Sequence, residues 1–147
     1  MKRTPHVMVV DDIDDDFATV IEAAQCYGFA LEILRAASGF DCIRQLRASS
    51  GDPAAWPLLL LLDLDGRGDD CRDTLVEMKT DAQLHVVPIV ILTTSAHPRD
   101  IQFCYDHHAN AYHIKSVNHV THLQTLQQIL GYWINSALLP MQRSAIK

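Results

Sequence analysis

Basic residues and long apolar runs are both scarce in this chain of 147 residues. It has 12 Lys and Arg against 18 Asp and Glu, a net charge of -6, and its only basic run is Lys2-Arg3. Proteins hold duplex nucleic acid through clustered Lys and Arg that neutralise its phosphates, so we expect no nucleic-acid partner. The longest unbroken aliphatic run is Leu58 to Leu62, far short of the ~20 residues that span a membrane. We therefore expect no membrane partner either.

The four cysteines also exclude something, because they are widely spaced and form no CxxC pair. Free thiols in a reducing compartment are the simplest interpretation. No apolar stretch follows Lys2-Arg3 closely enough to form a signal peptide. These features predict a cytoplasmic location, and the length suits one domain with a sizeable core.

Short apolar runs alternate with longer amphipathic ones along the whole chain. This alternation predicts a doubly wound α/β fold, in which helices cover both faces of a five-stranded parallel sheet. The expected strands are about 7–10, 30–35, 58–62, 89–92 and 111–114. The expected helices are about 14–24, 40–47, 71–79, 98–107 and an extended C-terminal helix, 117–139, that stops before Pro140.

Polar residues follow four of these strands at the point where each ends. They are Asp11 and Asp12, then Asp63, Thr93 and Lys115. The carboxyl ends of parallel strands meet at one edge of the sheet, which is where ligands of such folds bind. Carboxylates gathered there repel one another unless a cation compensates them, and hard oxygen ligands suit Mg²⁺. A Mg²⁺ site is therefore expected at this edge.

Four segments together resemble the receiver domain of two-component response regulators over essentially the whole chain. They are Val10-Asp11-Asp12, Leu61-Leu62-Asp63-Leu64-Asp65, Pro88 to Ser95, and Ala109-Asn110-Ala111-Tyr112 followed by Lys115. Within that family the chain looks most like stand-alone receivers paired with phytochrome kinases. Leu92-Thr93-Thr94-Ser95 and the tail from Tyr132-Trp133 to Leu139-Pro140 carry this narrower likeness.

The resemblance implies a flavodoxin-like fold and a function in phosphorelay signalling. Asp63 would accept a phosphoryl group from a sensor histidine kinase, with a phytochrome-type photoreceptor kinase implied by the narrower likeness. Such a domain is no enzyme beyond taking phosphate from small donors and losing it again. Its signal would pass to other proteins by direct binding.

The resemblance also assigns roles to single residues. Asp11, Asp12, Asp63 and the backbone carbonyl of Asp65 would organise Mg²⁺ and its waters. A second group would respond to the phosphoryl group: Lys115 contacts its oxygens, Thr93 moves toward it and Tyr112 changes rotamer. Positioning and electrostatics of this kind carry most of phosphoryl transfer.

Three departures from the family pattern keep a second hypothesis open. Asp65 stands where the family usually has Asn, and Gly66-Arg67 stands in place of Leu-Pro. Lys115 is followed by Ser116, where the family has Lys-Pro. A cis bond before Ser would cost about 2.5–4 kcal/mol, so either this bond is trans or the fold carries strain. The alternative is a degenerate receiver that acts as a phosphorylation-independent binding module.

A third hypothesis comes from Leu62 to Gly66, which resembles the opening motif of haloacid-dehalogenase-like phosphatases. In those enzymes the motif follows the first strand of the domain, whereas here it follows the third. Turnover of a simple phosphate monoester would separate the two families.

The C-terminal helix is richer in apolar residues than a core-facing helix needs. One stripe (Leu123, Leu126, Leu130 and Ile134) suffices for the core, which leaves Ile129, Trp133, Leu138 and Leu139. Surplus apolar surface usually marks an interface, so these four residues predict a homodimer. The chain is expected to be a single receiver domain over 1–147, with a core of about 5–130 and an extension of about 131–147.

Overall fold

The computed structural model describes residues 5–26, 31–48, 52, 55–65 and 71–139. Gly66-Arg67, which the sequence marks as a departure from the receiver pattern, lies outside the described residues, as do residues 140–147 of the predicted extension.

The predicted five-stranded parallel sheet is confirmed. Its strands, in the spatial order β2-β1-β3-β4-β5, all pair in parallel. They are β1 (His6–Val10), β2 (Glu32–Ala36), β3 (Leu59–Asp63), β4 (Ile89–Thr93) and β5 (Ala111–Ile114). The second strand begins two residues later than expected. Because the order reverses between β1 and β3, the ends of these strands flank the crevice in which such folds bind ligands.

The described residues contain five α-helices, as predicted: four connect successive strands and the fifth follows β5. They are α1 (Asp14–Gln25), α2 (Gly39–Ala48), α3 (Cys71–Thr80), α4 (Pro98–Asp106) and α5 (His119–Leu130). A short 3-10 helix, η2 (Leu84–Val86), precedes β4 and was not expected. Among the described helices none is long and apolar enough to cross a bilayer.

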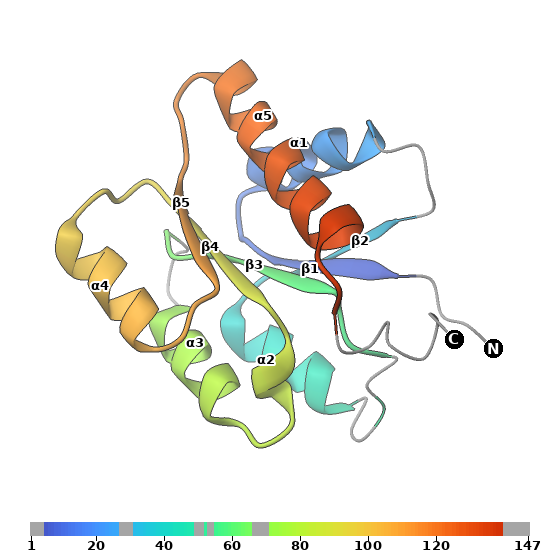
Figure 1. Ribbon diagram of the computed structural model, residues 1–147, viewed down its shortest axis with the longest axis vertical. Helices are drawn as coiled ribbons and strands as arrows, with labels where there is room; N and C mark the ends of the chain where they lie inside the picture. The colour runs from blue at the N-terminus through green and yellow to red at the C-terminus, as the bar shows by residue number, and fades with distance from the viewer. Residues whose placement is uncertain (1–4, 27–30, 49–51, 53–54, 66–70, 140–147) are drawn as a thin grey trace.

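The sheet lies between two helical layers, with α1 and α5 on one face and α2, α3 and α4 on the other (Figure 1). Alternate residues of the central strands feed the two cores, since successive strand side chains point to opposite faces. Leu60 and Leu62 pack under α2 and α3, whereas Leu59 and Leu61 pack under α1 and α5. Every position of β3 is buried, which explains its unbroken run of leucines.

The C-terminal helix is shorter than predicted. The α-helix ends at Leu130, continues as one π-helical turn, η3 (Gly131–Ser136), and gives way to extended backbone at Ala137. A π-helical turn is wider than an α-helical one and shifts the faces that follow it. All four residues of the predicted core stripe nevertheless pack against the core: Leu126 and Leu130 are buried, and Leu123 and Ile134 are partly buried.

The assignment of Ile129 and Leu139 to surplus surface is wrong. Ile129 is 4% exposed and belongs to the same buried cluster as Leu126 and Leu130, while Leu139 is also 4% exposed. Trp133 packs partly against that cluster. The core-facing surface of the helix is thus broader than predicted, because Ile129 and Trp133 pack beside the expected stripe.

Candidate functional site

Asp63 ends β3 at the carboxyl edge of the sheet and is buried, with 2% of its surface exposed. Its Oδ1 accepts a hydrogen bond of 2.8 Å from the backbone N–H of Asp65, which fixes the turn that follows the strand. Its second oxygen, Oδ2, remains directed at the neighbouring strand ends. A buried carboxylate needs a compensating partner, because burial otherwise disfavours its charge.

Lys115 supplies that partner from the end of β5. Its Nζ lies 2.5 Å from Oδ2 of Asp63 and 2.8 Å from Oδ2 of Asp16, and its side chain is only 8% exposed. The backbone N–H of Lys115 donates to the carbonyl of Thr93, which ties the residue to the end of β4. The described residues contain no cis peptide bond, so the bond from Lys115 to Ser116 is trans, and Lys115 nevertheless reaches Asp63.

Four carboxylates, those of Asp11, Asp16, Asp63 and Asp65, have an oxygen within 3.9 Å of Lys115 Nζ. Three of them form a tighter group. Oxygens of Asp11, Asp16 and Asp63 lie within 4.8 Å of one another, an arrangement that could hold a metal ion. Asp12, which the sequence assigns to the metal set, is partly buried and is not a member of this group. Asp16 is a member, although it was not among the metal ligands expected from the sequence. The missed signal is its place in the first turn of α1, directly after the loop that carries Asp11.

The close packing of these groups raises the pKa of both Asp11 and Lys115. Burial is the main cause that raises the pKa of Asp11 to about 7, with the charge of Asp63 adding to it, while the Ile13 amide and Lys115 act in the opposite direction. Burial lowers the pKa of Lys115, but hydrogen bonds to Asp16 and Asp63 and the surrounding carboxylates raise it above its usual value. The site therefore favours a charged lysine among carboxylates that repel one another.

Thr93 and Tyr112, the other two residues predicted to respond to the phosphoryl group, lie beside this cluster. Thr93 ends β4, is 1% exposed, and donates its hydroxyl to Oδ1 of Asp65 at 2.8 Å. The Tyr112 hydroxyl donates to the carbonyl of Ser95 at 2.8 Å. The structure thus brings Asp11, Asp63, Asp65, Thr93 and Lys115 to one edge. Tyr112 lies in β5 and reaches the segment after β4 through its hydroxyl.

Comparison with known proteins agrees with this geometry. No family model matches the chain. The solved structure of the phosphorylated cyanobacterial phytochrome response regulator RcpA is 32% identical, superposes with a TM-score of 0.85, and is matched over 94% of this chain and 99% of that one. The chain belongs to the response regulators.

Two further relatives are response regulators as well. Response regulator Rcp1 of Synechocystis sp. (strain ATCC 27184 / PCC 6803 / Kazusa) is 29% identical over 135 residues, which are 91% of this chain and 92% of that protein. Its Mn²⁺-bound structure superposes with a TM-score of 0.83 over 92% of this chain and 99% of that one. The receiver domain of a Rhodospirillum rubrum response regulator is 28% identical with a TM-score of 0.79, over 92% and 97% of the two chains.

Sequence reasoning missed one residue that supports this receiver site. Arg35, in β2, donates from Nε to the carbonyl of Asp11 at 2.9 Å and pairs with Asp14 at 2.7 Å. Its guanidinium also lies 5.2 Å from the centre of the Phe17 ring. Arg35 thereby holds the loop between β1 and α1, which carries Asp11. No motif marks it, because its contacts depend on the pairing of β2 with β1.

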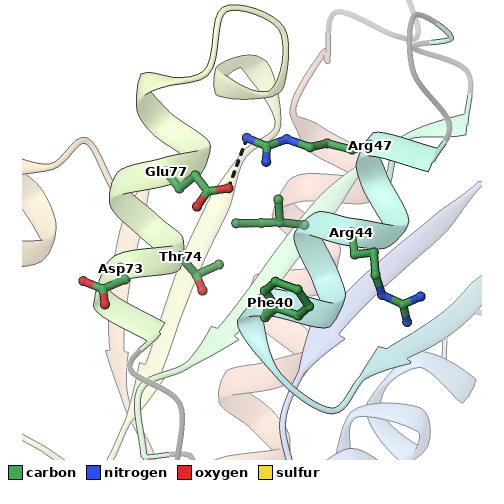
Figure 2. Close-up of a pocket in the computed structure, with 7 residues that line it drawn as sticks. Phe40, Arg44, Arg47, Asp73, Thr74 and Glu77 are labelled. Atoms are coloured by element: carbon green, nitrogen blue, oxygen red, sulfur yellow. Dashed lines mark ion pairs between the residues drawn. The ribbon is translucent and has the colours of Figure 1, made fainter.

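A hollow of about 490 Å³ lies between α2 and α3, apart from the carboxylates (Figure 2). Phe40 and Ile43 line it from α2, Thr74 lines it from α3, and the Arg47–Glu77 ion pair of 3.1 Å crosses it. None of the predicted site residues lines this hollow.

Proposed function

We propose that Asp63 is the phosphoacceptor of this response regulator and that a sensor histidine kinase is the donor. The observation that carries the proposal is the contact of 2.5 Å between Lys115 Nζ and Asp63 Oδ2, inside a ring that also contains Asp11 and Asp16. In the transfer, an oxygen of Asp63 attacks the phosphorus of a phosphohistidine whose other ring nitrogen carries a proton. The bond from phosphorus to the kinase imidazole nitrogen breaks, its electron pair stays on that nitrogen, and neutral histidine leaves. The product is an acyl phosphate on Asp63.

The side chains present suit each part of that reaction. Lys115 offsets the negative charge of the incoming group, and its burial strengthens that attraction relative to water. The carboxylates of Asp11 and Asp63 and the backbone carbonyl of Asp65 are hard oxygen donors that fit Mg²⁺, with Asp16 or Asp12 on the same edge. When bound there, Mg²⁺ would neutralise charge on the phosphoryl oxygens. The relative Rcp1 has an Mn²⁺-bound structure, which supports the binding of a divalent cation by this chain as well.

Exposed apolar residues around the edge support contact with a kinase. Ile13 follows Asp11 and Asp12, and Val117 and Val120 follow Lys115, and all three are exposed. A phosphohistidine must come within bonding distance of Asp63, so the kinase must cover this rim. We propose that the protein acts in the cytoplasm as a single receiver domain, and that its phosphorylated form binds other proteins through α4, β5 and α5. The division into a core of about 5–130 and an extension of about 131–147 stays a prediction.

Acetyl phosphate tests the phosphoacceptor directly. With Mg²⁺ and acetyl phosphate, the pure protein is expected to gain one acid-stable, base-labile phosphoryl group, detected by intact-mass spectrometry. Asp63→Asn should gain none and remain folded, because the amide keeps the shape of the carboxylate. Asp106→Asn, on the exposed end of α4, is the matched control and should be modified like the wild type.

The outcome also separates the alternative functions. Absence of any adduct on the wild-type protein would favour a degenerate receiver that binds partners without phosphate. Multiple turnovers of a phosphate monoester would instead favour the phosphatase.

The homodimer is also our proposal, with a smaller contact surface than the sequence indicated. Tyr132 and Leu138 are exposed, Leu138 to 63%, and Trp133 is partly exposed with its ring edge-to-face against Tyr132. Aromatic residues are common anchors of interfaces, and a two-fold axis is the commonest way for one patch to cover itself. Ile129 and Leu139 are buried and would then contribute indirectly, by packing beneath the exposed residues of the patch.

Sedimentation equilibrium tests this interface. The wild type is expected to dimerise in the micromolar range, and the double variant Tyr132→Ser with Leu138→Ser to weaken the dimer by at least tenfold, since two anchors are lost. Tyr105→Ser, an exposed tyrosine on α4, serves as the control that should leave the equilibrium unchanged. A monomer at all micromolar concentrations, with and without acetyl phosphate, would exclude the dimer.

A further inference from the structure

The side chain of Asp65 holds the segment that follows β4. Its Oδ1 accepts a hydrogen bond of 2.8 Å from the Thr93 hydroxyl, and its Oδ2 accepts one of 2.7 Å from the backbone N–H of Thr94. The backbone N–H of Asp65 in turn donates to Asp63 Oδ1 at 2.8 Å. The Asp65 carboxylate therefore binds the end of β4, and the backbone of Asp65 is itself hydrogen-bonded to Asp63.

The Thr93 hydroxyl has one proton to donate. In this arrangement the proton goes to Asp65, and Thr93 is 1% exposed, so water does not compete for it. Leu92 pairs with Asp63 across the sheet, which puts Thr93 one residue beyond the phosphoacceptor at the same edge. A phosphoryl group on Asp63 would need the same hydroxyl proton to gain a hydrogen bond from Thr93.

We infer that the Asp65 carboxylate competes with the phosphoryl group for the Thr93 hydroxyl and holds the β4 end in the unphosphorylated arrangement. The inference rests on the proposed phosphorylation of Asp63. Asp65 is then a positioning residue: it acts on the switch through Thr93 and Thr94 and does not take part in the transfer of phosphorus.

Charge determines how the competition resolves. Lys115 Nζ lies 3.9 Å from Asp65 Oδ2 and much closer to Asp63. The lysine therefore compensates the charge on Asp63 rather than that on Asp65. A phosphoryl group brings further negative charge to the edge where Asp65 lies, and like charges repel. The hydrogen bond from Thr93 to Asp65 is thus weakened by the same event that offers Thr93 a new acceptor.

A double-mutant cycle tests the competition, with beryllofluoride and Mg²⁺ as a non-covalent phosphoryl mimic. Its dissociation constant is measured by amide NMR titration for the wild type, Asp65→Ala, Thr93→Val and the double variant. Loss of the Asp65 charge tightens anion binding to some extent in either background. A hydrogen bond to a charged group contributes enough to change an equilibrium about tenfold. We therefore expect Asp65→Ala to lower the dissociation constant of beryllofluoride by a factor that is roughly ten times larger in the protein with Thr93 than in Thr93→Val.

The ligand-free protein supplies a second measurement that does not depend on binding. The Thr94 amide hydrogen is expected to exchange about tenfold faster in Asp65→Ala than in the wild type, because its acceptor is gone. Asp65→Asn keeps the size of the side chain and is the control for a variant that fails to fold. Its amide oxygen can still accept a hydrogen bond, so the Thr94 amide should exchange at an intermediate rate.

The outcomes separate this inference from the proposed function. Equal tightening in the two Thr93 backgrounds would mean that Asp65 acts by charge alone and would overturn the competition, while the phosphoacceptor role stands. Unchanged exchange at Thr94 would overturn it as well. Failure of all four proteins to bind beryllofluoride would overturn the proposed function and the competition together.

Discussion

Replacing Lys115 with methionine is expected to destabilise the metal-free protein by about 3–5 kcal/mol near pH 8, as measured by urea unfolding. The substitution keeps an apolar stem of similar volume and removes the one charge that lies among Asp11, Asp16 and Asp63. Asp11 and Asp63 are both buried, so their repulsion is poorly screened by water. Breaking a buried ion pair by removing one partner leaves an uncompensated charge, which is the costly case.

Magnesium should recover most of that loss, because the cation takes over the compensation of the three carboxylates. Lys79→Met is the matched control. The Lys79 side chain is partly buried, but its ammonium donates to neutral oxygens, namely Val87 O at 3.2 Å and Asn110 Oδ1 at 3.0 Å. Its loss should cost about 1–3 kcal/mol that Mg²⁺ does not recover. Equal recovery in both variants, or none in Lys115→Met, would contradict a cation site at the strand ends.

The stability of the metal-free wild type is expected to fall between about pH 4 and pH 7 through Asp11. Its pKa is raised from 3.8 to about 7 in the folded protein. Over this range the unfolded chain releases the proton that the folded protein keeps, so the free energy of unfolding declines by up to about 1.4 kcal/mol per pH unit. A difference of about 3 pH units corresponds to roughly 4 kcal/mol, fully lost above pH 7.

His122, which lies near the site, changes the stability in the opposite direction. Burial lowers the pKa of His122, whose surroundings include Asp16 and Lys115. The folded protein therefore favours neutral His122, and this contribution to stability is lost as the pH falls below the unfolded value of 6.5. The difference between the wild type and Asp11→Asn removes this background and isolates Asp11.

Metal should reverse the trend, since Mg²⁺ binds the ionised carboxylate and competes with its proton. The rise in melting temperature on addition of Mg²⁺ is expected to be large near pH 8 and small near pH 5. At 100 times its dissociation constant a ligand of the folded state adds about 2.7 kcal/mol. Asp11→Asn should be more stable than the wild type without metal at pH 8 and gain little from Mg²⁺. A gain from Mg²⁺ that does not change between pH 5 and pH 8 would refute the role of Asp11.

The fold could be predicted almost completely from the pattern of residues. Runs such as Leu58 to Leu62 are apolar at every position, which only a strand covered on both faces can bury. Their alternation with amphipathic segments leaves few topologies, since parallel connections are right-handed and short. The C-terminal region was the exception, because the π-helical turn at Gly131–Ser136 has no periodic signal of its own.

The sequence by itself determined which residues meet at the working edge of the sheet. A residue that ends a parallel strand lies at the carboxyl edge whatever its neighbours do, so the positions of Asp11, Asp63, Thr93 and Lys115 follow from strand boundaries alone. Tertiary structure decided which side chains touch there. Asp16 reaches Lys115 only because α1 packs beside α5, and Asp65 grips Thr93 only because β3 and β4 pair in one register. Contacts between side chains that are far apart in the sequence depend on how their segments pack in space, and no local sequence pattern specifies this. The burial of Ile129 and Leu139 was decided in the same way, by how the last helical turn packs onto the core.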